Sequence, residues 1–152
     1  MTALAALLLA AIFGGTDQYL GSLSAHPWAA DLSLLSAPWL MLAFVVGWTR
    51  RNARRAALLG FACTLAALVG YGLMTLSPVE NADLTLQSGV AFIRSELGVF
   101  GGAVVTGPLF GWFGYRWRSG RAWVGASITA AAVILEPLAH SAAGSAIRFP
   151  AV

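Results

Sequence analysis

The chain has 152 residues, of which 59% are hydrophobic and only 10% are charged, and its formal net charge is +3. A soluble domain usually carries about 25% charged residues to solvate its surface, so this composition excludes an ordinary water-exposed globule. All nine basic residues are arginines, and seven of them fall in two short clusters between apolar segments. That distribution excludes a basic face for nucleic acid and indicates loops that orient membrane spans.

Five apolar stretches follow one another along the chain. Each is close to the ~20 residues that an α-helix needs to cross the hydrocarbon core of a bilayer. We therefore predict an all-α, multi-pass protein of the cell membrane, with a single transmembrane helical domain over residues 1–152. The first stretch has no positively charged segment before it and no clear cleavage site, so we expect a retained span and not a signal peptide. The stretches are Thr2–Gly21, Leu32–Trp48, Ala56–Leu76, Glu96–Tyr115 and Trp123–Ala143.

The arginines predict the orientation of these spans. One cluster, at residues 50–55, lies between the second and third stretches, and the other, at residues 116–121, lies between the fourth and fifth. Arginine-rich loops stay in the cytoplasm, which places the N-terminus inside and the C-terminus outside. The connections Trp28–Asp31 and Val79–Arg94 then face outward. We expect the second of these, which is the longest, to contain a short interfacial helix or a lid.

Small residues four positions apart predict where helices approach each other closely. The fourth stretch has two such pairs and is expected to be the most protein-buried helix, while the first stretch has one. The pairs are Gly98/Gly102, Gly107/Gly111 and Ala6/Ala10.

Ionisable side chains at membrane depth are costly and are by default candidates for function. Asp17 in the first span and Glu136 in the fifth fall at similar depth in the outer half of the membrane, as does Tyr71 in the third. Glu96 lies at the outer end of the fourth span, and His140 follows Glu136 by four residues on the same helix face. We expect a polar site in this layer, although each acid could instead serve only as a bond between helices.

Aromatic residues are abundant, with six Trp, eight Phe and three Tyr. Most lie near span ends, as in the aromatic belts of membrane proteins. A ring face attracts a cation, so aromatic walls beside a buried acid suit carbocation chemistry, and they suit an apolar or aromatic ligand equally well. Phe44, Phe92 and Phe113 are candidates for the lining of a cavity. The candidate substrate contacts are Gln18, Tyr19, Trp39, Phe100, Phe110 and Trp112.

Motifs for metal or phosphate binding are missing from the sequence. It has no HExxH, no CxxC, no phosphate-binding loop and no aspartate-rich motif, and Cys63 stands alone in an apolar stretch. We predict neither a metal nor a cofactor.

Four short segments carry a resemblance to known proteins: Asp-Gln-Tyr at 17–19, Ser-Ala-Pro-Trp at 36–39, Gly-Pro-Leu-Phe-Gly at 107–111 and Leu-Glu-Pro at 135–137. With these segments the chain resembles a family of small actinobacterial membrane proteins, most of which have no assigned function. Its size and its buried acids also resemble the bacterial integral-membrane terpene cyclases that act on indole sesquiterpenoids.

The second resemblance implies an isomerase of terpenoid biosynthesis that needs no metal. In such an enzyme a carboxylic acid kept protonated by an apolar site donates a proton to a prenyl double bond, and a base removes a proton after ring closure. Asp17 or Glu136 would be the proton donor, and Glu96, Tyr71 or His140 would act as the base or the orienting group. The substrate would be lipid-soluble and would enter from the membrane lipids.

Two other classes remain open. The first is a small transport component, either a substrate-binding subunit or a proton-coupled exporter that works as a homo-oligomer. The second is a structural subunit in which the acids only connect helices.

Overall fold

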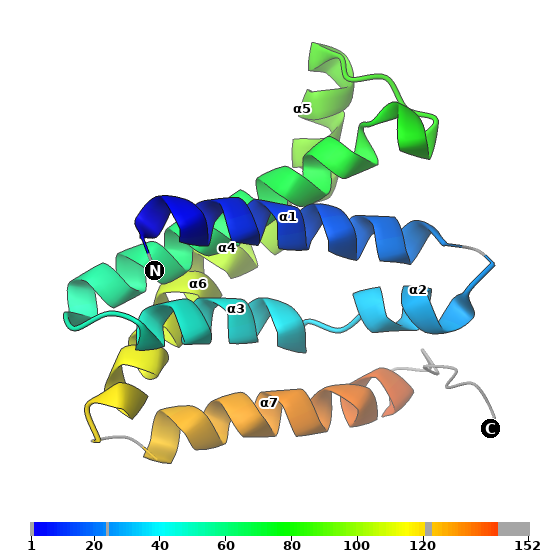
Figure 1. Cartoon of the computed structure of the whole chain (residues 1–152). Helices are drawn as coiled ribbons and strands as arrows, with labels where there is room; N and C mark the ends of the chain where they lie inside the picture. Colours follow the sequence, from blue (N-terminus) through cyan, green and yellow to red (C-terminus); the bar gives the residue numbers. More distant parts are fainter. Residues whose placement is uncertain (1, 24, 121–122, 143–152) are drawn as a thin grey trace.

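The computed structural model describes residues 2–23, 25–120 and 123–142 (Figure 1). In these ranges the chain forms helices and no strands, so the prediction of an all-α protein is confirmed. A short 3-10 helix, η1 (Pro78–Glu80), precedes α5. The α-helices are α1 (Ala3–Ser22), α2 (Pro27–Ser33), α3 (Ala37–Trp48), α4 (Ala53–Thr75), α5 (Leu86–Ser95), α6 (Leu97–Arg118) and α7 (Trp123–Ala142).

Three of the described helices, α1, α4 and α6, are long and apolar enough to cross a membrane. The pair α2–α3 reaches the same length and apolarity only when its two parts are counted together, and it is bent by 52°. α7 has 20 residues. Its apolar part, Gly125–Glu136, is shorter than the helices that are long enough to cross a membrane. The helices correspond to the five predicted stretches, but the second stretch is broken.

The break separates α2 from α3 inside the segment predicted as one span, Leu32–Trp48. The residues predicted as a connection, Trp28–Asp31, are instead helical and belong to α2, which begins at Pro27, a residue favoured in the first turn of a helix. Pro38 explains why α2 does not continue into α3. It has no N–H to donate to the carbonyl of Leu34, and its ring would clash with that carbonyl.

Small residues bring α1 against α4. Ala6, Ala10 and Gly14 lie on one face of α1 and are buried there. A Cβ atom on Gly14 would lie 1.8 Å from the carbonyl oxygen of Ala67 in α4, so only glycine permits this approach. The close packing predicted for this face of the first span is confirmed.

The glycines of α6 divide into two groups. A Cβ atom on Gly111 would lie 2.5 Å from the carbonyl oxygen of Ala56, and Gly107 is similarly close to α4. For Gly98 and Gly102, in contrast, an added Cβ would meet nothing within 4 Å. Close packing is therefore confirmed for the second pair, and the same prediction is wrong for the first pair, which faces open space.

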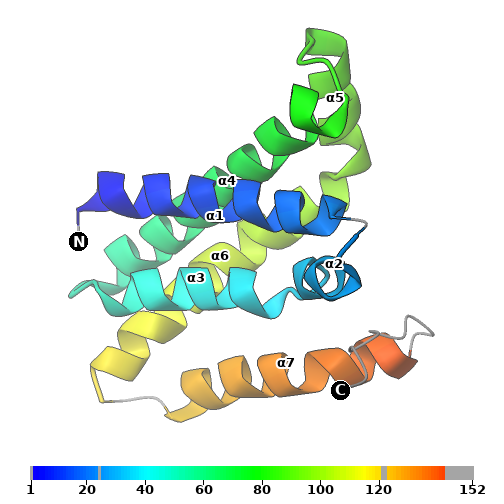
Figure 2. The same ribbon diagram turned by 45° about the vertical axis from the view of Figure 1, so that its right-hand side comes forward.

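The remaining elements surround this core. α3 lies between α1 and α7 in both views (Figures 1 and 2), and its C-terminal carbonyl, on Trp48, accepts a hydrogen bond of 3.3 Å from the Arg118 guanidinium. α5 projects from one end of the molecule (Figures 1 and 2). The helix expected within the connection Val79–Arg94 is thus present. It is amphipathic, and Leu86, its first residue, is 93% exposed.

Candidate functional site

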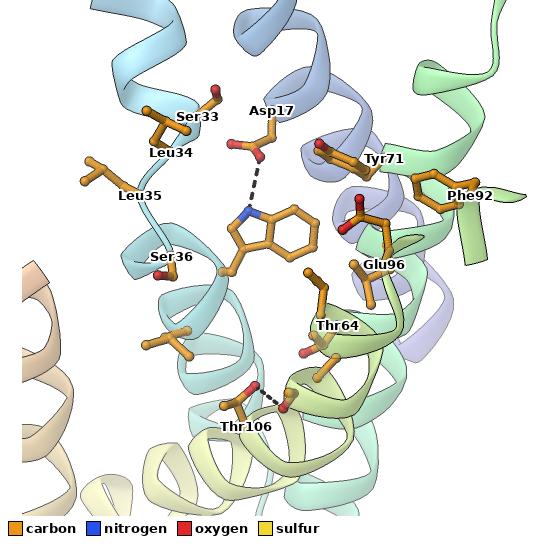
Figure 3. A pocket seen from close by; sticks show the side chains of 16 residues that line it. Asp17, Ser33, Leu34, Leu35, Ser36, Thr64, Tyr71, Phe92, Glu96 and Thr106 are labelled. Atoms are coloured by element: carbon orange, nitrogen blue, oxygen red, sulfur yellow. Dashed lines mark hydrogen bonds between the residues drawn. The ribbon is translucent and has the colours of Figure 1, made fainter. Parts of the chain in front are cut away.

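A cavity of about 370 Å³ opens among α1, α3, α4, α5, α6 and the break between α2 and α3 (Figure 3). It lies towards the end of the bundle opposite residues 50–55 and opposite the C-terminal end of α6, which carries Arg116 and Arg118 (Figure 1). Most of its lining is apolar. The residues in its wall that carry an acid or hydroxyl group are Asp17, Ser33, Ser36, Thr64, Tyr71, Glu96 and Thr106.

Asp17 is placed by the packing of α1. It lies three residues after Gly14 on the buried face of the helix, and its exposed fraction is only 8%. The indole N–H of Trp39 donates a hydrogen bond of 3.2 Å to Asp17 Oδ2, which joins the start of α3 to α1. Asp17 therefore makes a bond between helices, as the sequence allowed, and its partner is Trp39. Arg94 is exposed on α5.

A row of aromatic rings runs along the cavity from α1 to α6. The ring centroids of Phe13 and Trp39 are 5.5 Å apart, and those of Trp39 and Tyr71 are 6.2 Å apart. Phe92 continues the row, 6.2 Å from Tyr71 and 6.4 Å from Phe100. Of these five rings, Trp39, Tyr71 and Phe92 line the cavity. Phe92 comes from α5, so the projecting helix contributes one wall of the site.

Glu96 is the second acid in the cavity. It occupies the junction between α5 and α6, and its side chain makes no capping hydrogen bond to α6. Figure 3 shows its carboxylate directed into the space in front of Tyr71, whose hydroxyl points towards Asp17. The lining includes no Arg, Lys or His. Two acids, one from α1 and one from the junction between α5 and α6, therefore share one aromatic-walled space.

Glu136 does not line the cavity but binds the residues that form its wall. Its Oε1 atom accepts hydrogen bonds from the backbone N–H and the hydroxyl of Ser36, and its Oε2 atom accepts one of 2.8 Å from the N–H of Ala37. These groups are the N-terminal end of α3, where the helix dipole favours a negative charge. The side chain of His140 lies outside the described part of the structure.

The other candidate contacts lie away from the cavity. Gln18 and Tyr19 are absent from its lining, and Tyr19 is exposed on α1. Phe110 is buried in a hydrophobic cluster between α3 and α6. Trp112 lies on the outside of α6, with the guanidinium of Arg116 5.3 Å from its ring centroid.

The cavity also includes residues that the sequence did not single out. Ser33 is the last residue of α2 and Ser36 lies in the break, and the Ser-Ala-Pro sequence at 36–38 is the signal that would have located the break. Thr64 and Thr106 each donate to a carbonyl of their own helix, at 3.0 and 2.9 Å. Nothing in the local sequence distinguishes these two threonines from others.

Among the described residues, no group of three or more His, Cys, Asp or Glu could hold a metal ion.

Comparison with known proteins gives one family. Neither the curated proteins nor the solved structures include a match. A family of unknown function, DUF6518, matches residues 1–146, which is nearly the whole chain. The chain therefore belongs to the DUF6518 family.

Proposed function

We propose that the protein is an integral-membrane, metal-independent terpene cyclase that acts on a prenylated, lipid-soluble substrate. The observation that supports this proposal is the presence of two acids, Asp17 and Glu96, in one aromatic-walled cavity. A cavity of about 370 Å³ lies within the range of roughly 300–1,000 Å³ typical of small-molecule sites.

Asp17 is the proposed proton donor. Its Oδ2 atom accepts the Trp39 N–H, and its Oδ1 atom has no hydrogen-bond partner in the described part of the chain, so Oδ1 can carry the proton. Transfer of this proton to a carbon–carbon double bond leaves a carbocation, and a second double bond attacks it to close a ring. Glu96 then accepts a proton from the cyclic carbocation, which becomes the neutral product, and Asp17 regains a proton while Glu96 loses one before the next turnover. One proton enters and one leaves, so the product is an isomer of the substrate.

The cavity walls support the cationic intermediate. The electron-rich ring faces of Trp39, Tyr71 and Phe92 attract positive charge. The leucine and valine side chains of the lining exclude water, which would otherwise capture the cation.

A transport component is the second candidate, and the broken span favours it. The unwound residues 34–36 line the cavity, and discontinuous helices form the substrate sites of many transporters. In this alternative the cavity binds its ligand and releases it without chemical change.

The test is turnover by the protein in membranes. Farnesylated indole and related prenyl-aromatic compounds are incubated with the wild type, Asp17→Asn and Glu96→Gln, and isomers are separated by chromatography and detected by mass spectrometry. Since general acid catalysis contributes about 10²–10⁴-fold, each variant should lose at least about a hundredfold in rate. Asp83→Asn, which alters an exposed acid outside the cavity, should retain wild-type activity. A folded wild type that converts no substrate would favour the transport component.

A further inference from the structure

We propose that the cavity binds a lipophilic organic cation, an amine or quaternary ammonium group on an apolar body, between the carboxylates of Asp17 and Glu96 and the rings of Trp39 and Tyr71. This inference concerns binding alone and does not depend on the proposed reaction. In the proposed cyclase Asp17 becomes a carboxylate once it has donated its proton, and that form would bind the cation, while a transporter would bind the cation directly.

The cavity lining carries acidic side chains and no basic side chain. Asp17 and Glu96 both line it, whereas no Arg, Lys or His does. Among the described residues neither acid forms an ion pair, and Arg94, on the neighbouring helix, is exposed and outside the lining. Asp17 is buried and Glu96 is half-buried, and carboxylates that lose hydration without a cation to compensate are unfavourable. A positively charged ligand would supply the missing partner.

One carboxylate oxygen of Asp17, Oδ1, has no hydrogen-bond donor among the described residues. The side chain is 8% exposed, and the Trp39 indole bonds only its Oδ2 atom. No described group donates to Oδ1. The indole holds the carboxylate in a fixed orientation, so the free oxygen is preorganised for a ligand that donates a hydrogen bond or carries a charge.

Aromatic rings form the wall of the cavity beside Asp17. Trp39 and Tyr71 lie next to each other, with ring centroids 6.2 Å apart, and both border the cavity. Trp and Tyr are the rings that bind cations best, and aromatic cages are a common means of recognising quaternary ammonium groups. Leu34, Leu68 and Val99 provide the apolar surface for the body of the ligand.

An organic cation fits these groups better than a metal ion does. In the described ranges no cluster of three metal-ligating side chains occurs, and hard cations such as Ca²⁺ require six or more oxygen ligands. An ammonium group on an apolar body, by comparison, uses two carboxylates, aromatic faces and aliphatic contacts together.

The test uses two probes of nearly identical shape. The full-length protein in nanodiscs is titrated with radiolabelled benzyltrimethylammonium, and protein-free nanodiscs are subtracted. Unlabelled benzyltrimethylammonium and its uncharged isostere neopentylbenzene then compete for the site. We expect saturable binding of the cation, with the isostere competing at least about tenfold less effectively.

Substitutions locate the site. Asp17→Asn and Glu96→Gln should each weaken binding by about tenfold or more, because each removes a charge-assisted contact. Gly102→Leu should abolish binding, since Gly102 lines the cavity and has open space around it. Gly101→Leu is the matched control, because Gly101 is equally open but outside the lining.

Three results would overturn the proposal: no saturable binding to the wild type, equal competition by the isostere, or wild-type affinity in both acid variants. Thermal unfolding of each variant shows whether it is folded, and the Gly102 and Gly101 pair keeps the test decisive if Asp17→Asn does not fold. The protein could turn over a substrate without binding the cation, or bind the cation without turnover. The binding experiment and the turnover assay therefore test the two proposals separately.

Discussion

At the residue scale, Glu136 and Asp17 are both acids that the sequence predicts at similar depth, but their surroundings differ. Asp17 faces the cavity and has one bonded oxygen. Glu136 accepts hydrogen bonds on both carboxylate oxygens from the start of α3. The structure thus gives Glu136 the surroundings of a helix cap, whereas Asp17 lines the cavity with one carboxylate oxygen unbonded among the described residues.

We predict that Glu136→Ala destabilises the protein by about 1–2 kcal/mol, the usual effect of losing an N-terminal cap. Glu136→Gln should retain less than half of that stabilisation, because its single amide oxygen can replace only one of the two accepting carboxylate oxygens and its NH2 group would face the remaining N–H donor. Unfolding by SDS in mixed micelles, monitored by circular dichroism, measures the free energy of unfolding of both variants. A double-mutant cycle with Ser36→Ala should give a non-additive change.

The same pair of variants tests the role of Glu136 in turnover. If Glu136 were the proton donor, Glu136→Gln would inactivate the protein as fully as Asp17→Asn. A cap predicts that the glutamine variant remains active.

At the element scale, the contact between α1 and α4 depends on the absence of a side chain at one position. Gly14 packs directly against the backbone of Ala67, whereas its neighbour Gly15 has an added Cβ at 3.4 Å from the nearest atom, the carbonyl oxygen of Gly70, which is ordinary contact. The two glycines therefore provide a matched comparison within one turn of helix.

We predict that Gly14→Ala lowers the free energy of unfolding by about 1–3 kcal/mol through overpacking, and that Gly15→Ala changes it by less than about 0.5 kcal/mol. The measurement is the same unfolding assay. Because Asp17 lies one turn beyond Gly14 on the same face, Gly14→Ala should also weaken ligand binding. Equal effects of the two substitutions would contradict this account of the interface.

At the scale of the whole molecule, the cavity lies towards the end of the bundle opposite residues 50–55 and the C-terminal end of α6. With the orientation expected from the arginines, the cavity opens towards the outer face of the membrane. The orientation can be tested with single cysteines, because the native Cys63 is fully buried.

We predict that a membrane-impermeant maleimide labels Gln87→Cys on intact cells and labels Ser119→Cys only after permeabilisation. Both positions are exposed, and both substitutions leave the net charge unchanged. The opposite labelling pattern would place the cavity on the cytoplasmic side.

Much of the fold follows from the sequence, because hydropathy, arginine clusters and small-residue spacing act along single helices. The five apolar stretches, the helix before the fourth stretch and the face of Ala6 and Ala10 were predictable for this reason. The site was predictable only in part. Asp17, Tyr71, Glu96 and Trp39 were candidates and meet in one cavity.

The remaining features depend on how the helices rotate against each other. The sequence indicates that Glu136 lies at the depth of Asp17, but not that it turns towards α3. Gly98 and Gly102 have the spacing of a packing motif, although their face of the helix is open. Whether such a face is packed or open depends on the positions of the neighbouring helices, which the local sequence does not give.

The contact between Ser36 and Glu136 has a consequence for how the chain assembles. The two residues are 100 positions apart, so Ser36 is synthesised long before its partner in α7. Until then the N–H groups of Ser36 and Ala37 lack the carboxylate that accepts from them in the folded protein. This part of the cavity wall therefore cannot make its final contacts until α7 has been synthesised.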